Sequence, residues 1–266
     1  MKPSRPQPTA GFRKLILQGL GLLGVAALWQ MASSLGHLSE HLFPSPWYLL
    51  QCWFGFVFGT GWKSPYAGQF WLHGTVSLLR VVAGFSLASA MGISAGILCA
   101  RVQILALLTD PFVQFVRSIP GIAWLPIAMV WFGIGTQTTL FLISLAAFFP
   151  VYVNTFHGVR EVPIGWIHAA LTLGANRGQM IGRVILPAAW PSIQTGLRLA
   201  MGISWAYVVL GELTGVNTGL GAMIMDARMM GDVPVMLVGM VSIALLGRLS
   251  DLLLMYGTGL LWKRVA

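Results

Sequence analysis

Arg80, Arg117 and Glu212 are charged residues that stand inside long apolar stretches of this chain. A charged group within a bilayer costs at least about 2.5 kcal/mol, so each of them needs a partner or a polar cavity. Either arginine could bind a small anion that crosses the membrane, and Pro120 would kink the helix beside Arg117 and expose backbone carbonyls to a cavity. Alternatively, either arginine could pair with Glu212 or extend to the membrane interface. The four residues are therefore candidates for a translocation path, with both interpretations left open.

The sequence lacks the residue patterns of common enzymes. It contains no Gly-x-x-x-x-Gly-Lys-Ser/Thr loop that could bind nucleotide phosphates, and no Ser/His/Asp or His-Glu-x-x-His arrangement. The five histidines are scattered, and the two cysteines, Cys52 and Cys99, have no metal-ligand spacing and are expected to stay unpaired. We therefore expect no catalytic residue, no metal site and no cofactor, and we predict that the chain is not an enzyme.

The composition is that of a membrane protein. Apolar residues make up 56% of the 266 residues, charged residues only 9%, and the mean hydropathy is +0.78. A soluble domain would carry about a quarter of charged residues. The apolar stretches are long and continuous, which favours helices over the short alternating strands of a membrane barrel. The net charge of +9 comes from basic residues near the ends of these stretches, so nucleic-acid binding is not expected.

Six membrane-spanning helices fit the apolar pattern best, which predicts an all-α polytopic membrane protein. The first stretch is too long for a signal peptide and is interpreted as a retained span. The third is expected to begin at Asp110-Pro111 and to kink at Pro120 and Pro126. In the second, Gly92-x-x-x-Gly96 is expected to let helices pack closely within the subunit. The predicted spans are 15–35, 75–100, 111–132, 139–157, 191–213 and 234–256.

Basic residues predict the orientation of these spans. They cluster before the first span, after the second, after the fourth and at the end of the chain, and an even number of spans places all four groups in the cytoplasm. Five spans would leave one group outside. We therefore expect cytoplasmic tails at 1–14 and 263–266, a transmembrane domain at 15–262, and both termini in the cytoplasm. Arg248 and Asp251, three residues apart, are expected to pair within the last helix.

A polar segment interrupts the apolar pattern between the fourth and fifth spans, at 158–190. It is expected to form two short helices around Gly174, because glycine readily adopts the left-handed conformation that ends a helix. Asn176 would cap the second helix, with Gln179 in capping-box register. Pro187 would stop that helix, and Pro191 would open the next span. Taken alone, this pattern also fits a surface hairpin that binds no partner.

The spacing within this segment carries a resemblance to a known family. His168-Ala169-Ala170, then Gly174, then Val184-Ile185-Leu186-Pro187 closely resembles the Glu-Ala-Ala…Gly…Ile-x-Leu-Pro loop of permease subunits in bacterial ATP-driven (ABC) importers. Further motifs resemble the sulfonate, taurine, nitrate and bicarbonate group, with aliphatic sulfonate permeases as the closest match. They include Phe43-Pro44-Ser45-Pro46, Ser77-Leu78-Leu79-Arg80, Arg117-Ser118-Ile119-Pro120, Trp131-Phe132-Gly133-Ile134-Gly135 and Gly219-Leu220-Gly221.

This resemblance implies the fold of a type I ABC importer permease in the bacterial inner membrane. It implies two ATPase subunits that bind the ATP, a second copy of the permease, an extracytoplasmic substrate-binding protein and surrounding lipid. The cargo would be a small anion such as an alkanesulfonate or taurine, moved by alternating access. The loop 158–190 would dock onto the ATPase through His168, Ala169, Ala170, Gly174, Val184, Leu186 and Pro187.

The chain departs from the family pattern at His168, where the pattern has Glu. The change replaces a fixed negative charge, and with it any ion pair that the acid would make with the ATPase. Two alternatives to the importer permease remain. A self-sufficient secondary transporter or channel would use an ion gradient and need intramembrane acids, for which Glu212 is the one clear candidate. A scaffold subunit would not need the loop for uptake.

Overall fold

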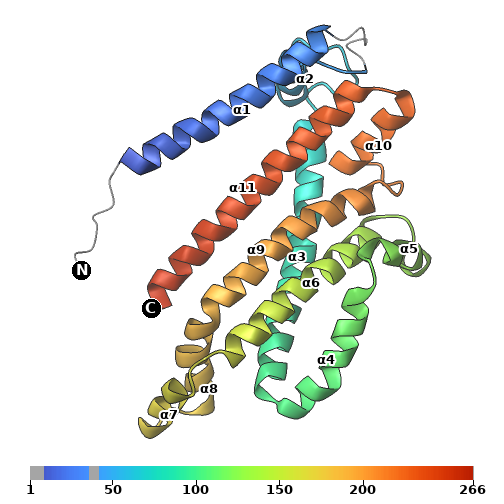
Figure 1. The fold of residues 1–266 in the computed structure, drawn as a ribbon. Helices are drawn as coiled ribbons and strands as arrows, with labels where there is room; N and C mark the ends of the chain where they lie inside the picture. Colours follow the sequence, from blue (N-terminus) through green and yellow to red (C-terminus); the bar gives the residue numbers. More distant parts are fainter. Residues whose placement is uncertain (1–8, 36–41, 266) are drawn as a thin grey trace. The chain divides into compact units, whose positions relative to one another are not determined.

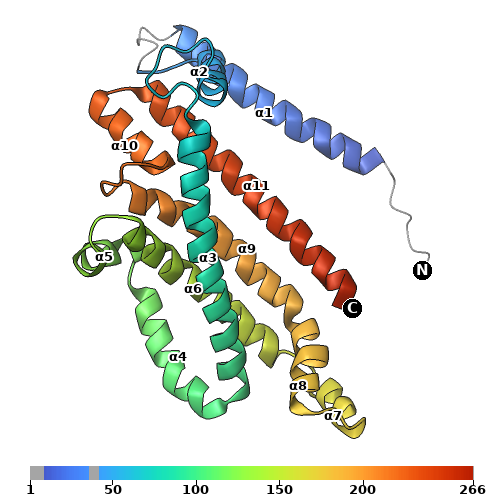
Figure 2. The same ribbon diagram turned by 180° about the vertical axis from the view of Figure 1, so that it is seen from behind.

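The structure is a computed structural model that describes residues 9–35 and 42–265, and all the regular secondary structure of these residues is helical (Figures 1 and 2). The all-α prediction is confirmed. The elements are α1 (Thr9–Leu35), α2 (Pro46–Phe58), α3 (Phe70–Arg101), α4 (Gln103–Ser118), a 3-10 helix (Gly121–Trp124), α5 (Leu125–Phe132), α6 (Thr136–Arg160), α7 (Ile164–Thr172), α8 (Arg177–Met180), a π-helix (Ile181–Ile185), α9 (Leu186–Glu212), α10 (Leu220–Met230) and α11 (Val233–Val265).

The chain divides into two compact units. The smaller comprises the described residues up to Phe70 together with Ala227–Val238. Within it, Ser45 caps α2 by accepting a hydrogen bond from the Tyr48 N–H at 3.2 Å, Pro46 occupies the first helical turn, and Gly59 ends the helix with a φ of 75°. The larger unit comprises Trp71–Asp226 and the chain from Gly239 onward, and it holds every residue that the sequence predicts to be functional.

Four of the described helical stretches are long and apolar enough to cross a membrane, namely Phe70–Arg101, Thr136–Arg160, Arg177–Glu212 and Val233–Gly259. The count rises to five if the bent pair α4 and α5 forms one span. The predicted first span, 15–35, lies within α1. The multi-pass character follows from these helices, whereas the total of six stays a prediction.

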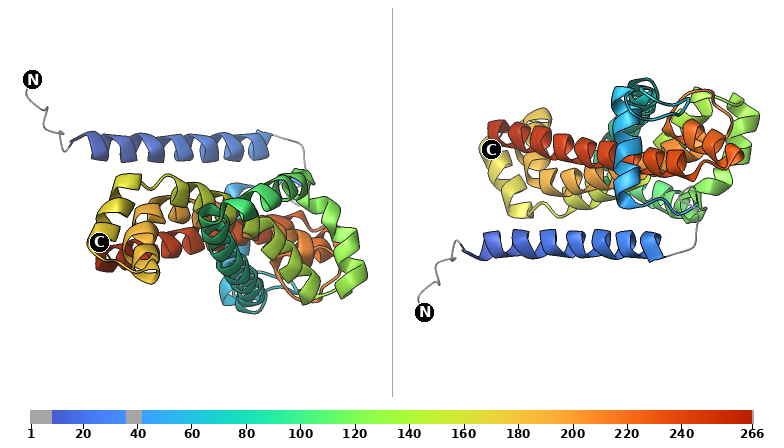
Figure 3. Two further views of the ribbon diagram at one scale, coloured as in Figure 1. Left: turned by 90° about the horizontal axis from the view of Figure 1, so that it is seen from below. Right: turned by 90° about the horizontal axis from the view of Figure 1, so that it is seen from above.

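The predicted third span starts earlier than expected and is broken into two helical segments, not kinked as one helix. Instead of running from 111 to 132, the chain forms α4, which already begins at Gln103, and then turns by 91° into the helices from Gly121 to Phe132 (Figure 3). Pro120 causes the break, because its ring disfavours the helical conformation of the preceding residue. Ile119 is accordingly extended, with φ −76° and ψ 121°.

The predicted helix stop at Pro187 is also wrong. The structure continues from Arg177 to Glu212 as one helical stretch, with Pro187 in the first turn of α9 and Pro191 inside it. The π-helix accommodates the proline, because the N–H of Leu186 donates to the carbonyl of Ile181, five residues back. This wider turn relieves the crowding that a proline causes in a regular α-turn.

The glycines of α3 bring that helix close to α6, as the Gly92-x-x-x-Gly96 pattern predicts. A Cβ atom on Gly92 would lie 2.9 Å from the Val151 side chain, and one on Gly96 would lie 2.7 Å from the Thr155 side chain. Because real Cβ atoms do not approach other heavy atoms this closely, glycine is needed at both positions. The α3–α6 contact is part of the buried core of the larger unit.

Gly96→Ala is therefore expected to lower the thermal unfolding midpoint of the detergent-solubilised protein. Overpacking costs about 1–3 kcal/mol, which exceeds the gain of up to about 1 kcal/mol in helix propensity. Gly202→Ala in α9 is the control, because a Cβ atom there meets nothing within 4 Å. That variant should melt at the same temperature as the wild type or above it. Equal midpoints for both variants would contradict the packing role of Gly96.

Cys52 is buried in α2, with 1% of its surface exposed. Burial raises the pKa of its thiol, because it disfavours the charged thiolate, and the nearby Asp232 adds to this effect. Alkylation requires the thiolate. In a Cys99→Ser background, maleimide should label the folded protein slowly at pH 8 and label it rapidly after denaturation. Rapid labelling of the folded protein would show that Cys52 is accessible.

Candidate coupling loop and transmembrane cavity

The segment 158–190 forms two short helices around Gly174, as predicted. Gly174 has a φ of 78°, and the N–H groups of Gly174 and Ala175 donate to the carbonyls of Leu171 and Ala170. This is the Schellman pattern, in which a left-handed glycine closes a helix. Asn176 and Gln179 form the predicted capping box, with mutual hydrogen bonds of 2.9 and 3.0 Å. The backbone around the turn is thus hydrogen-bonded within the chain itself.

Helix α7 leaves an apolar face exposed. Ile167 and Ala170 pack against the core of the larger unit, whereas Leu173 is 87% exposed at the end of the helix. Ile164, Trp166 and Leu171 are also exposed. A polar loop outside the membrane has no lipid to cover such residues, so an exposed apolar cluster there is typical of a protein-binding site.

A groove between α7 and the start of α9 brings the predicted coupling residues together. Its volume is about 590 Å³. Of the predicted residues, Ala169, Ala170, Val184 and Pro187 line it. Leu186 packs against the core instead, and His168 is exposed on α7 outside the lining. The remaining lining residues are Trp166, Leu173, Arg183, Ala188 and Pro191.

Arg80 and Glu212 form a buried ion pair. The Arg80 Nη1 lies 2.8 Å from the Glu212 Oε1, with side-chain exposures of 8% and 0%. Glu212 also accepts hydrogen bonds from the Ser77 hydroxyl at 2.8 Å and from the Gly221 N–H at 2.9 Å. Arg80 donates a further bond to the Thr218 carbonyl at 2.6 Å. The structure therefore has the internal pair that the sequence left open as the alternative to a path role.

The same network explains two of the sequence motifs. The Ser77 hydroxyl accepts a bond from the Leu220 N–H at 2.9 Å, and His73 Nδ1 lies 2.9 Å from the Gly219 carbonyl oxygen. A Cβ atom on Gly219, whose φ is 137°, would lie 2.4 Å from the Glu212 carboxyl carbon. Gly219-Leu220-Gly221 thus needs glycine so that the backbone can approach a buried carboxylate. Sequence reasoning missed His73 and Ser77, whose spacing from Arg80 on one helix face was the available signal.

A second unpredicted contact links α9 to α11. Asp251 pairs with Arg248 at 3.1 Å, as expected, but also accepts two bonds from Arg198, at 2.9 and 3.0 Å. Arg198 is 44% exposed, so this pair lies at the surface of the subunit. Its second partner could not be found by spacing, because Arg198 lies 53 residues away in the sequence.

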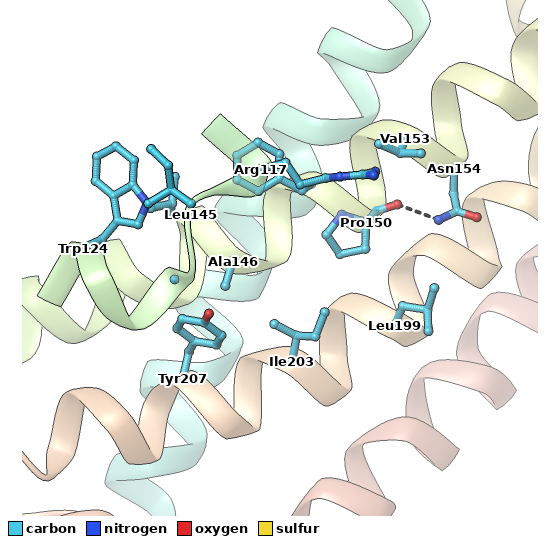
Figure 4. Close-up of a pocket in the computed structure, with 13 residues that line it drawn as sticks. Arg117, Trp124, Leu145, Ala146, Pro150, Val153, Asn154, Leu199, Ile203 and Tyr207 are labelled. Carbon is cyan, nitrogen blue, oxygen red and sulfur yellow. Dashed lines mark hydrogen bonds between the residues drawn. The ribbon is translucent and has the colours of Figure 1, made fainter. Parts of the chain in front are cut away.

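Arg117 lines a cavity of about 530 Å³ between the end of α4, α6 and α9 (Figure 4). The break before Pro120 opens it, since Ile119, Gly121 and Trp124 form one side. The other lining residues are Leu145, Ala146, Phe149, Pro150, Val153 and Asn154 of α6, and Leu199, Ile203 and Tyr207 of α9. Arg80 and Glu212 are not among them. Of the four path candidates, the structure thus places Arg117 in the cavity wall, Pro120 between two of its lining residues, and Arg80 and Glu212 in a closed ion-pair network.

Comparison with known proteins gives this geometry a family context. Residues 92–265 match the family described as the inner membrane component of binding-protein-dependent transport systems. SsuC of Bacillus subtilis, named as an aliphatic sulfonates transport permease protein, is 35% identical over 85% of this chain and 79% of its own length. The taurine transport system permease protein TauC of Escherichia coli is 33% identical over 88% and 84%. The bicarbonate transport system permease protein CmpB of Synechococcus elongatus is 34% identical over 93% and 91%.

A solved structure shares the fold. An inward-facing structure of the MetNI methionine ABC transporter superposes with a TM-score of 0.62 at 21% identity, covering 77% of this chain and 100% of the matched chain. At that identity the likeness concerns the fold alone. The family match covers most of the chain. The permeases SsuC and CmpB are each more than 30% identical to this chain over at least 79% of their own length. This chain therefore belongs to the family of inner membrane components of binding-protein-dependent transport systems, the permeases of ABC importers.

Proposed function

We propose that this chain forms the transmembrane path of an ATP-driven importer for a small anion, such as an alkanesulfonate or taurine. The observation that carries the proposal is the exposed apolar face of α7, held on a polar loop between two apolar spans. A chain without a nucleotide-binding loop needs a separate ATPase, and this face offers a docking surface for one. The names of the relatives, which refer to sulfonates, taurine and bicarbonate, support a small anion as cargo.

The proposed assembly contains two copies of this permease, two ATPase subunits and an extracytoplasmic binding protein, within lipid of the inner membrane. Both termini and the α7 loop would lie in the cytoplasm, since basic residues flank these segments. The groove residues Ala169, Ala170, Val184 and Pro187 would contact the ATPase, with Gly174 setting the angle of the loop and Leu186 anchoring it to the core. His168 would contact the ATPase at the position where the family pattern has an acid.

Transport would depend on two parts of the chain, the loop 158–190 and the cavity around Arg117. ATP bound by the partner subunits would draw their docking surfaces together, and the loop would pass that movement to α6 and α9, between which it lies in the sequence. The cavity around Arg117 and Pro120 would then open to alternate sides. We assign a structural role to Arg80 and Glu212, because their charges already form an ion pair within the subunit.

The test is uptake by proteoliposomes that contain the permease with its co-purifying ATPase and a binding protein from the same organism. ATP inside the vesicles should drive accumulation of a radiolabelled small anion, and omission of any component should abolish it. If the permease alone accumulates the anion under an ion gradient, the chain is a secondary transporter. Glu212, the one clear acid for such coupling, sits in a buried ion pair, which argues against that outcome.

A further inference from the structure

We infer that the cavity around Arg117 is a binding site for alkanesulfonates, with the sulfonate on Arg117 and the alkyl chain against α6 and α9. This inference rests on the proposed function and deepens it, because it distinguishes an organic anion from an inorganic one. The volume of about 530 Å³ lies within the range of small-molecule sites. It is large for bicarbonate or sulfate and suits an anion that carries several carbon atoms.

The charge of the cavity favours an anion. Arg117 is its one charged lining residue. The ion pairs among the described residues join Arg80, Arg198 and Arg248 to Glu212 and Asp251, so Arg117 takes part in none of them. Arg117 is exposed at the cavity. Within a bilayer, a guanidinium without a partner is costly unless a polar cavity or a ligand meets it. A sulfonate can accept two parallel hydrogen bonds from it, as carboxylates and phosphates do.

Of the two polar side chains near the cation, Tyr207 can give the anion a directional contact. In Figure 4 the Arg117 side chain extends toward Asn154, while Tyr207 approaches from α9. The Asn154 amide nitrogen is already engaged with the Pro150 carbonyl at 2.8 Å. The Tyr207 hydroxyl lies against Gly121, where a Cβ atom would collide with it. Gly121 thereby leaves room for a hydroxyl at the cavity wall, where it can donate to an anion.

The rest of the wall is apolar. Leu145, Phe149 and Val153 of α6 face Leu199 and Ile203 of α9 across the cavity. Burying a methylene group on such a wall is favourable by about 0.8 kcal/mol, whereas burying an unpaired ammonium is strongly unfavourable. The site should therefore prefer propanesulfonate to taurine, which has nearly the same size but carries an ammonium group in place of the terminal methyl.

The experiment measures displacement of radiolabelled butanesulfonate from the whole permease–ATPase complex in lipid nanodiscs, without the binding protein. From ethanesulfonate to butanesulfonate the affinity should rise by about two- to fourfold per methylene. Propanesulfonate should compete better than taurine, and inorganic sulfate should compete weakly. Leu199→Asn should flatten the gain per methylene, so that the affinity for butanesulfonate falls more than the affinity for ethanesulfonate.

Arg117→Gln should weaken butanesulfonate binding by about tenfold or more, and Arg117→Lys should weaken it less, because the lysine keeps the charge but loses the paired geometry. Arg101→Gln is the matched control, since Arg101 is an exposed arginine outside the cavity. Binding that is equal for sulfate and butanesulfonate, stronger for taurine, or unchanged in Arg117→Gln would overturn the inference.

ATP-driven uptake by the complete system separates this inference from the proposed function. If the wild-type system accumulates an anion but its cavity does not bind butanesulfonate, the inference fails and the importer stands. If the system accumulates no anion with ATP, the proposed function fails, whatever the nanodisc assay shows.

Discussion

Glu212→Gln is expected to lower the free energy of unfolding by about 3–5 kcal/mol, the cost of leaving one member of a buried ion pair without its partner. Arg80 would remain 92% buried beside a neutral amide, and the bond from the Gly221 N–H would weaken. The measurement is the unfolding midpoint of the detergent-solubilised protein, followed by circular dichroism. A large drop in the unfolding midpoint would show that the ion pair stabilises the subunit and would assign it a structural role instead of a place in the translocation path.

Asp251→Asn provides the matched control for this prediction. It makes the same chemical change in a pair whose arginine, Arg198, is 44% exposed, so it should cost about 1 kcal/mol or less. The double variant Arg80→Met with Glu212→Leu should recover part of the loss, because it removes both charges together. If Glu212→Gln and Asp251→Asn melt at similar temperatures, the buried pair contributes little to stability.

Leu173→Glu is expected to reduce ATP-driven uptake at least tenfold without changing insertion or the unfolding midpoint. Leu173 is 87% exposed in the subunit, so the change removes little internal packing. Burying a leucine on a partner is favourable by about 1.5–3 kcal/mol, whereas burying an unpaired carboxylate is unfavourable. The loss should therefore appear as weak association with the ATPase.

Co-purification of the ATPase with tagged permease measures this association directly. Leu173→Met keeps the apolar character and volume of the side chain, so that variant should retain both the ATPase and uptake. Leu173→Glu that retains the ATPase in full amounts would show that α7 does not dock through this face.

The loop could be predicted from sequence because its determinants are local. The left-handed turn at Gly174 and the capping box of Asn176 and Gln179 each depend on residues within a few positions of one another. The all-α class likewise followed from long apolar stretches. Predicting these features does not depend on which residues pack against them, so the local sequence was enough.

The prolines show where local reasoning stops. Pro120 breaks its helix by 91° although a mere kink was expected, whereas Pro187 continues a helix that it was expected to end. Each outcome depends on surroundings that a local rule does not contain, namely an extended Ile119 in one case and a π-turn in the other. The sequence named both Arg80 and Arg117 as possible partners of Glu212. Only the three-dimensional structure shows that Glu212 pairs with Arg80, which lies 132 residues away in the sequence.

The hydrogen bonds on both sides of Gly174 should favour binding of the ATPase to the loop. The turn acquires its shape when the subunit folds, because its backbone groups are hydrogen-bonded within the chain, at Gly174, Ala175, Asn176 and Gln179. Little conformational entropy then remains to be lost when another polypeptide arrives. A turn that is hydrogen-bonded in this way should also deform little under load, so a displacement of α7 should be passed on to the membrane helices.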